Sequence, residues 1–207
     1  MFGASGRTGK LICEQAKSAG HQVVAIVRDP AKMTSIAEIE VTKADIFDVD
    51  QIKDALRGVD VVFDCLGSND LGKSTLLQTT ISIILDAIRA CSIKRIIVLG
   101  ASGALHDSMK HQKLGSKIFF WLIRNTFLRH PMLDSGAQQR IVEGSELQYT
   151  VVHAPRLTDG PRVGKYRIDF YGLPKGAREL GREDLAEYML SLVNDATTFR
   201  KSPYIAY

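Results

Sequence analysis

Short apolar, β-branched runs alternate along this chain with longer segments in which apolar residues recur at helical spacing. The runs predict strands at 22–27, 40–42, 59–65, 95–100, 148–153 and 203–206. The helical spacing predicts helices at 7–19, 50–57, 73–92, 115–128, 135–144 and 183–193. Strands that alternate with helices in this way predict an α/β protein, whose parallel sheet is covered by helices on both faces.

Right-handed crossovers between such strands predict a Rossmann-type, doubly wound sheet of order 3-2-1-4-5-6. A length of 207 residues suits one domain over 1–207. One feature conflicts with this order, because the central first strand is reduced to Met1 and Phe2. A strand truncated at this point is expected to cost stability and to weaken ligand binding at the turn that follows it.

Composition and charge exclude several classes of protein. The net charge is +4, but the basic residues are scattered rather than grouped in a block, so a nucleic-acid partner is not expected. The three cysteines lack the spacing of zinc ligands or of a disulfide framework, which predicts no metal and favours a reducing, cytoplasmic setting. The apolar stretch 118–123 is too short to span a membrane.

A G-x-x-G-x-x-G turn opens the first predicted helix. Glycine permits a tight bend, close approach of a pyrophosphate to the backbone and close packing of the helix. The helix N-terminus then presents free N–H groups and a partial positive charge to an anion. An ordinary tight turn would give the same motif, but its place at the start of an alternating α/β chain favours a dinucleotide site. The turn consists of Gly3, Ala4, Ser5, Gly6, Arg7, Thr8 and Gly9.

A basic residue, Arg28, follows the next predicted strand, where the adenosine ribose of a dinucleotide is expected. An acidic residue there would bind the ribose hydroxyls of NAD, whereas Arg28 and Arg7 suit the 2′-phosphate of NADP(H). Asp29 is a competing signal for NAD, although it could instead cap the turn before Pro30. The sequence therefore favours NADP(H) over NAD(H).

These residues, taken with five further motifs in order, resemble the atypical short-chain dehydrogenase/reductases. The resemblance is to the NAD(P)H-binding, NmrA-like and biliverdin reductase B (flavin reductase) groups, and it covers nearly the whole chain. The motifs are Val-Arg-Asp-Pro at 27–30, Ala-Asp at 44–45, Leu-Gly at 66–67, Ala-Pro-Arg-Leu-Thr-Asp-Gly-Pro at 154–161 and Gly-Arg-Glu-Asp-Leu-Ala at 181–186.

The resemblance implies further cofactor-binding residues at three places. Asp45 and Ile46 would flank the adenine, and Cys65, Leu66 and Gly67 would line the ribose and nicotinamide side. Pro155, Arg156 and Leu157 would close over the nicotinamide. Cys65 is favoured as a buried apolar thiol rather than a reactive one. Arg156 could contact an anionic substrate or form an ion pair with Asp159. His153, where the family often has arginine, is expected in the core or at its rim.

The wider superfamily uses a Tyr-x-x-x-Lys pair on one helix face as its proton donor. The predicted helix 135–144 contains neither residue, and the motif at Tyr171 to Lys175 includes Gly172 and Pro174, which oppose a helix. Ser102 lies at the place of the superfamily's catalytic serine, where it could bind a substrate carbonyl or a flavin atom. An ordinary turn at 100–103 explains the serine equally well.

The leading interpretation is an NADPH-dependent reductase of flavins, quinones or other conjugated acceptors, because such acceptors need no protein proton donor. The alternatives are a non-catalytic NADP(H) sensor of NmrA-like type and a chain that has lost cofactor binding. The substrate side is expected at 104–131 and 157–175, since loops beyond strand C-termini form the crevice of such sheets. Phe119 and Trp121 could form an apolar wall of this crevice, or they could belong to the helix core or to an oligomer contact. The protein is expected to be a monomer or a homodimer.

Overall fold

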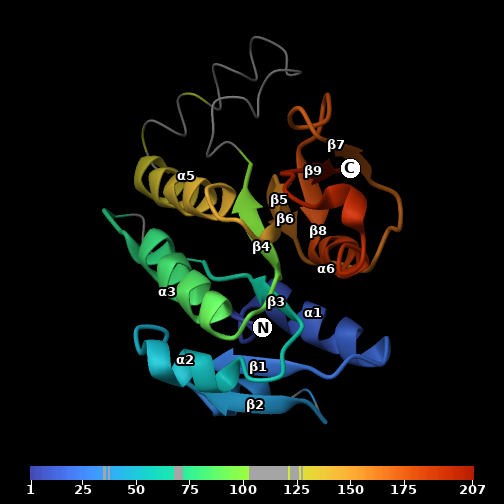
Figure 1. Ribbon diagram of the computed structural model, residues 1–207. Helices are drawn as coiled ribbons and strands as arrows, with labels where there is room; N and C mark the ends of the chain where they lie inside the picture. The colour runs from blue at the N-terminus through green and yellow to red at the C-terminus, as the bar shows by residue number, and fades with distance from the viewer. Residues whose placement is uncertain (35, 37, 68–71, 103–120, 122–125, 127) are drawn as a thin grey trace.

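The computed structural model describes residues 1–34, 36, 38–67, 72–102, 121, 126 and 128–207 (Figure 1). Its main sheet pairs β1 (Val24–Val27) with β2 (Glu40–Lys43), and joins β3 (Val61–Asp64), β4 (Arg95–Ala101), β5 (Gln148–Ala154), β9 (Tyr204–Ala206) and β7 (Arg167–Asp169) in the order β3-β4-β5-β9-β7. All pairs are parallel except β7 with β9. The predicted parallel sheet is confirmed, and an antiparallel edge strand extends it.

Met1 and Phe2 connect the two parts of this sheet. Phe2 forms parallel bridges to Ile26 on β1 and to Asp64 on β3. The Phe2 N–H donates to Phe63 O at 2.9 Å, and the Ile26 N–H donates to Met1 O at 3.0 Å. These two residues therefore occupy the first-strand position, and the predicted order 3-2-1-4-5-6 is confirmed with β9 and β7 added beyond it.

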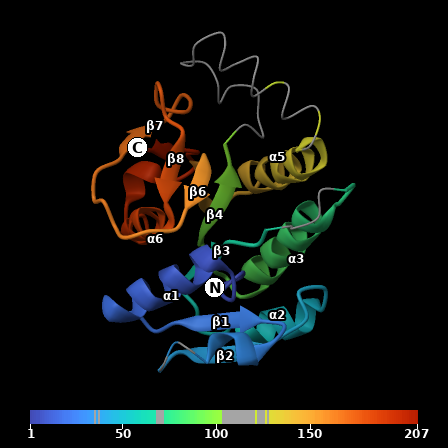
Figure 2. The same cartoon turned by 180° about the vertical axis from the view of Figure 1, so that it is seen from behind.

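Helices cover both faces of the sheet, as Figures 1 and 2 show. Helices α1 (Arg7–Ser18) and α6 (Arg182–Ser191) pack together on one face, and α2 (Val49–Ala55), α3 (Leu76–Ala90) and α5 (Arg129–Glu143) pack on the other. Alternation along the strands supplies both cores, because successive side chains of a strand point to opposite faces. Ile96 and Val98 face α3, whereas Ile97 packs with Leu185 of α6.

Several short elements carry no clear signal in the sequence. Strands β6 (Arg156–Thr158) and β8 (Glu179–Gly181) pair in a small second sheet, and turns of 3-10 helix lie at η1 (Pro30–Met33) and η3 (Ala196–Thr198). The predicted helix 115–128 falls almost entirely outside the described residues, and α5 begins earlier than predicted. No helix in the described part of the chain is long and apolar enough to cross a membrane.

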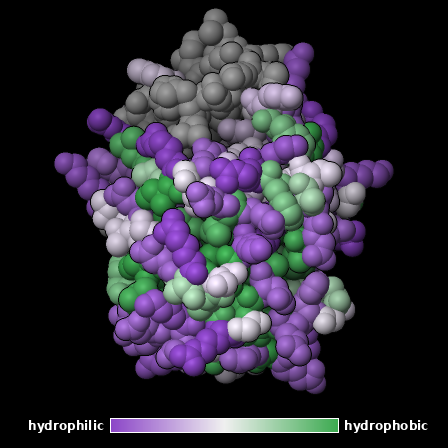
Figure 3. Space-filling model, viewed as in Figure 1, coloured by the Kyte–Doolittle hydropathy of each residue, from purple (hydrophilic) through white to green (hydrophobic). Residues whose placement is uncertain are grey.

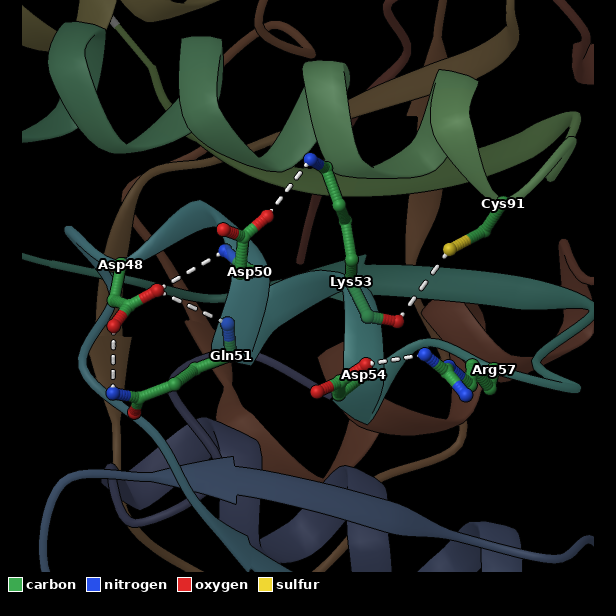
Figure 4. A network of polar contacts seen from close by, with 7 residues as sticks. All are labelled: Asp48, Asp50, Gln51, Lys53, Asp54, Arg57 and Cys91. Carbon is green, nitrogen blue, oxygen red and sulfur yellow. Dashed lines mark hydrogen bonds and ion pairs between the residues drawn. The ribbon is translucent and has the colours of Figure 1, made fainter.

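Polar side chains fix the start of α2 (Figure 4). Asp48 accepts hydrogen bonds from the backbone N–H groups of Asp50 and Gln51, and from the Gln51 side chain. Lys53 forms an ion pair with Asp50 within the helix, and Arg57, in the turn that follows the helix, forms one with Asp54. Because a capped N-terminus satisfies the first N–H groups, α2 begins at a defined residue directly after β2 and its following turn.

Candidate functional site

The glycine turn packs against the end of β3. Gly3 has φ +71°, and a Cβ there would lie 2.5 Å from Cys65 O. A Cβ on Gly9 would lie 2.1 Å from Gly3 O, and the Gly6 N–H donates to Gly3 O at 3.0 Å. Gly3 and Gly9 are therefore required by the close approach of backbone to backbone, as the sequence predicts.

The N-terminus of α1 opens from this turn without a side-chain cap. Gly6 is the N-cap residue, and the first turn of α1 carries no acidic side chain. The first N–H groups of a helix have no partner within the helix, and they carry its partial positive charge. Thr8 and Gly9 are buried against the turn, whereas Ser5 and Arg7 are exposed. This arrangement suits an anionic group placed beside the turn.

Arg7 reaches across from α1 to the segment after β6. Its guanidinium lies 2.9 Å from one carboxylate oxygen of Asp159, and Arg182 at the start of α6 lies 2.6 Å from the other. Arg182 is largely buried, whereas Arg7 and Asp159 are exposed. Asp159 therefore links the glycine turn to α6 and to the predicted substrate side, a link that the sequence does not reveal.

Arg156, a residue with two sequence-based interpretations, is exposed at the start of β6. Its guanidinium lies 3.6 Å from Glu179 on β8, so the proposed pairing with Asp159 is wrong. Asp159 is taken by Arg7 and Arg182, the first residues of α1 and α6, so both helices begin beside it. Pro155 and Leu157, its neighbours, are half-buried, and Leu157 packs against the core below α6.

The C-terminal ends of β1 and β2 lie side by side, because Val27 is paired with Lys43. Arg28 follows β1 and is exposed. Asp29 accepts a hydrogen bond from the Ala31 N–H at 3.1 Å and caps η1, so it fills the alternative role foreseen for it.

Asp45 and Ile46 form the turn that leads from β2 to α2. The Asp45 side chain accepts from the Phe47 N–H at 3.0 Å, and the Asp45 N–H donates to the Gln51 side chain at 3.0 Å. Ile46 is half-buried beside an exposed Phe47. The turn is thus held by its own hydrogen bonds at the same sheet edge as Arg28.

Beneath Cys65, Leu66 and Gly67 lies a buried carboxyl group that sequence reasoning missed. Asp64 is fully buried, accepts from the Leu66 N–H at 2.9 Å and accepts from the Gln138 side chain of α5 at 2.9 Å. Burial raises the pKa of Asp64 to about 6. Its only signal in the sequence is a charged residue that closes an otherwise apolar strand.

The Cys65 thiol stays protonated at neutral pH. Burial, and then the neighbouring Asp64 carboxyl, hold its pKa well above the ordinary value for a thiol. A thiol in that state is a poor nucleophile. This agrees with the interpretation of Cys65 as a packing residue, in contact with the glycine turn through its backbone.

Ser102 and His153 lie at the ends of neighbouring strands. Ser102 is buried, its N–H donates to Ala154 O at 3.0 Å, and its Oγ has no hydrogen-bond partner in the part of the chain that the structure describes. His153 is 1% exposed, stacks on Tyr204, and has its pKa lowered by burial to about 4. His153 is therefore a neutral core residue, as expected.

The predicted substrate side is only partly described. Phe119 lies outside the described residues, as does most of 104–131, and Trp121 is exposed. Residues 170–175 are not helical, so the Tyr171 to Lys175 motif does not form a helical pair. The segment 157–175 exposes four large apolar side chains, which are Val163, Ile168, Phe170 and Tyr171. Figure 3 shows the face of Figure 1 as mostly hydrophilic, with hydrophobic surface toward its middle.

A family model described as NAD(P)H-binding matches residues 3–196. Uncharacterized protein YwnB of Bacillus subtilis is 27% identical over 115 residues, which are 55% of this chain and 52% of YwnB. The match thus spans about half the length of that relative. Isoflavone reductase homolog P3 of Arabidopsis thaliana is 26% identical over 220 residues, which cover 99% of this chain and 67% of the homolog.

Two solved structures share the fold. A short-chain dehydrogenase/reductase from Veillonella parvula in complex with NADP has a TM-score of 0.79 at 15% identity, with 100% of this chain and 92% of that chain covered. ChuY, an anaerobillin reductase from Escherichia coli O157:H7, has a TM-score of 0.79 at 20% identity, with 99% and 94% covered. At these identities both structures establish the doubly wound fold alone.

Proposed function

The chain belongs to the NAD(P)H-binding family, and we propose that it is an NADPH-dependent reductase of flavins, quinones or similar conjugated acceptors. The observation that carries the proposal is a glycine turn with an uncapped helix N-terminus in a chain whose α5 helix holds neither tyrosine nor lysine. Ketone reduction by the usual pair is therefore disfavoured. A conjugated acceptor needs only stacking and orientation from the protein, because solvent can supply the proton.

The residues at the turn fit the phosphates of NADPH, which supplies the hydride when bound. The α1 N-terminus would hold the pyrophosphate, and the exposed Arg28 would hold the 2′-phosphate. Asp29 does not oppose this assignment, because its side chain caps η1. The NADP complex of the Veillonella structure, with the same fold, supports the choice of cofactor.

The acceptor would lie against 157–175, where exposed apolar side chains, together with Arg156 directly before the segment, suit a conjugated, anionic molecule. Ser102 would donate a hydrogen bond to it. The names of two similar proteins, a reductase homolog and an anaerobillin reductase, support reduction rather than binding alone. Three free cysteines support the proposal of a reducing, cytoplasmic setting.

The first test is a titration of the purified chain with NADPH and NADH, followed by FMN, riboflavin, a quinone or a linear tetrapyrrole. Oxidation of NADPH above background with one of these acceptors is the expected result. Tight binding without oxidation of NADPH by any of them contradicts the reductase and favours the sensor. Failure to bind either nucleotide contradicts both.

Arg28→Ala tests the cofactor choice. Loss of one charge-assisted contact to phosphate is expected to weaken NADPH binding by about 10- to 100-fold. NADH binding should change less than about twofold. Arg57→Ala is the matched control, because it removes an equal charge from the exposed end of α2. Equal losses for NADPH and NADH in Arg28→Ala would refute the assignment.

A further inference from the structure

The glycine turn and the segment after β3, which form the two halves of the proposed nucleotide site, meet through their backbones. A Cβ on Gly3 would lie 2.5 Å from Cys65 O and 2.9 Å from Leu66 N, so the phosphate-binding turn rests directly on the chain that leaves β3. The Cys65 N–H also donates to Phe2 O at 3.1 Å. Leu66 therefore lies where the glycine turn meets the proposed nicotinamide side of the site.

Asp64 fixes this junction through two hydrogen bonds. One carboxylate oxygen accepts from the Leu66 N–H, and the other accepts from the Gln138 amide, each at 2.9 Å. A fully buried carboxylate is costly, and it is tolerated when hydrogen bonds satisfy it. The two bonds fix the direction of the peptide at Leu66 at the expense of burying a charge.

Helix α5 supplies the other end of this contact. Gln138 and Asp134 lie one turn apart on the same face of α5. Asp134 accepts from the N–H groups of Leu77 and Gln78, and so fixes the start of α3. The helix that carries the tyrosine and lysine in the wider superfamily here orders backbone groups through two polar side chains.

We propose that Asp64 is a positioning residue of the cofactor site, which orients Leu66 and Gly67 toward the nicotinamide half of the bound nucleotide while Gln138 holds its carboxylate. The proposal rests on the proposed function for the placement of the nucleotide. It adds a residue that touches neither cofactor nor acceptor and acts through the Leu66 N–H. Removal of its carboxylate should therefore weaken the binding of NADPH more than the binding of a fragment that contains only the adenine side.

The first test compares NADPH with adenosine 2′,5′-bisphosphate, which lacks the nicotinamide half. Asp64→Ala removes the acceptor of the Leu66 N–H, and should weaken NADPH binding about tenfold or more while the fragment loses less than about threefold. Equal losses for both ligands, or none, would overturn the proposal. A wild-type chain that binds no NADPH overturns both this inference and the proposed function, whereas normal binding with an indifferent Asp64→Ala overturns this inference alone.

Asp64→Asn covers the case in which the alanine variant fails to fold. Its amide can accept from Leu66 and donate to a reoriented Gln138, so it mimics the protonated acid. NADPH should bind a few-fold less tightly to Asp64→Asn than to wild type at pH 8, and equally at pH 5. The Met1 ammonium and the Cys65 thiol interact with Asp64, and the 2′-phosphate of NADPH titrates at about pH 6. The measured quantity is therefore the ratio of the wild-type affinity to the Asp64→Asn affinity at each pH.

Asp134→Asn is the matched control, because Asp134 is also buried and also accepts two hydrogen bonds, in its case both from backbone N–H groups. This variant should lower the melting temperature and leave the ratio of NADPH to fragment affinity unchanged. Gln138→Met should reproduce part of the Asp64→Ala loss, since it removes the second bond to the carboxylate. A wild-type to Asp64→Asn affinity ratio that stays constant from pH 5 to pH 8 would overturn the proposal.

Discussion

Removing the buried charge at Asp64 should stabilise the protein at neutral pH. Burial raises the pKa of Asp64 from 3.8 to about 6, so the folded state binds a proton more tightly than the unfolded state. Above pH 6 the folded protein must hold the carboxylate in its ionised form. The difference between the two pKa values corresponds to about 3 kcal/mol of lost stability at pH 7 to 8.

The sign of the effect fixes its pH range. At pH 4 Asp64 is protonated in the folded state, and Asp64→Asn should differ little from wild type. As the pH rises from 3.8 through about 6, wild type loses stability relative to the variant, and the difference levels off above the folded-state pKa. With about 2–4 °C of melting temperature per kcal/mol for a domain of this size, the variant should melt several degrees higher at pH 8.

Urea unfolding of wild type and Asp64→Asn at several pH values from 4.5 to 8 measures this difference directly. The expected curve of the difference rises with pH and has its midpoint between the two pKa values. A difference that is independent of pH would refute the reasoning, because the cost would then not be that of a buried charge. The reasoning would also be refuted if the variant were less stable than wild type and this deficit were larger at pH 8 than at pH 5.

Two further predictions concern packing and acid stability. Gly9→Ala should abolish NADPH binding and lower the melting temperature, since its Cβ would lie 2.1 Å from Gly3 O. Gly20→Ala is the control for binding alone: nothing lies within 4 Å of its Cβ, but its φ of +85° disfavours alanine, so this variant should lose stability and still bind NADPH. A Gly9→Ala chain that binds NADPH normally would contradict the close-approach argument. Burial lowers the pKa of His153 to about 4, so the stability that His153→Phe gains over wild type should be larger at pH 5 than at neutral pH by about 2 kcal/mol. A difference in unfolding free energy, measured in urea, that is the same at both pH values would contradict this.

The sequence predicts those parts of the fold that depend on local pattern. The apolar runs at 95–100 and 148–153 became β4 and β5 with one residue added to each, because buried parallel strands are continuous apolar segments. The glycine turn is also predictable, since its backbone approach excludes any other residue at Gly3 and Gly9. Strands β6, β7 and β8 are too short to show a period, so pattern alone does not reveal them.

Contacts between distant segments account for what was missed at the site. Asp159 meets Arg7 and Arg182 because three separate chain segments converge there, and no spacing in the sequence encodes that convergence. The pairing of Arg156 was wrong for the same reason, since Glu179 comes beside it only when β8 pairs with β6. Asp64 looks like the end of an ordinary strand until Gln138 of α5 is placed against it.

Asp64 and His153 act in opposite directions on stability over the same pH range. Between about pH 4 and pH 6.5, ionisation of the buried carboxyl destabilises the folded state as pH rises, whereas loss of the proton from histidine favours it. The two contributions have opposite signs, so they offset one another in wild type. A flat stability profile for wild type is therefore compatible with two strongly perturbed groups. The single variants separate them, because Asp64→Asn should expose a profile that rises with pH and His153→Phe one that falls.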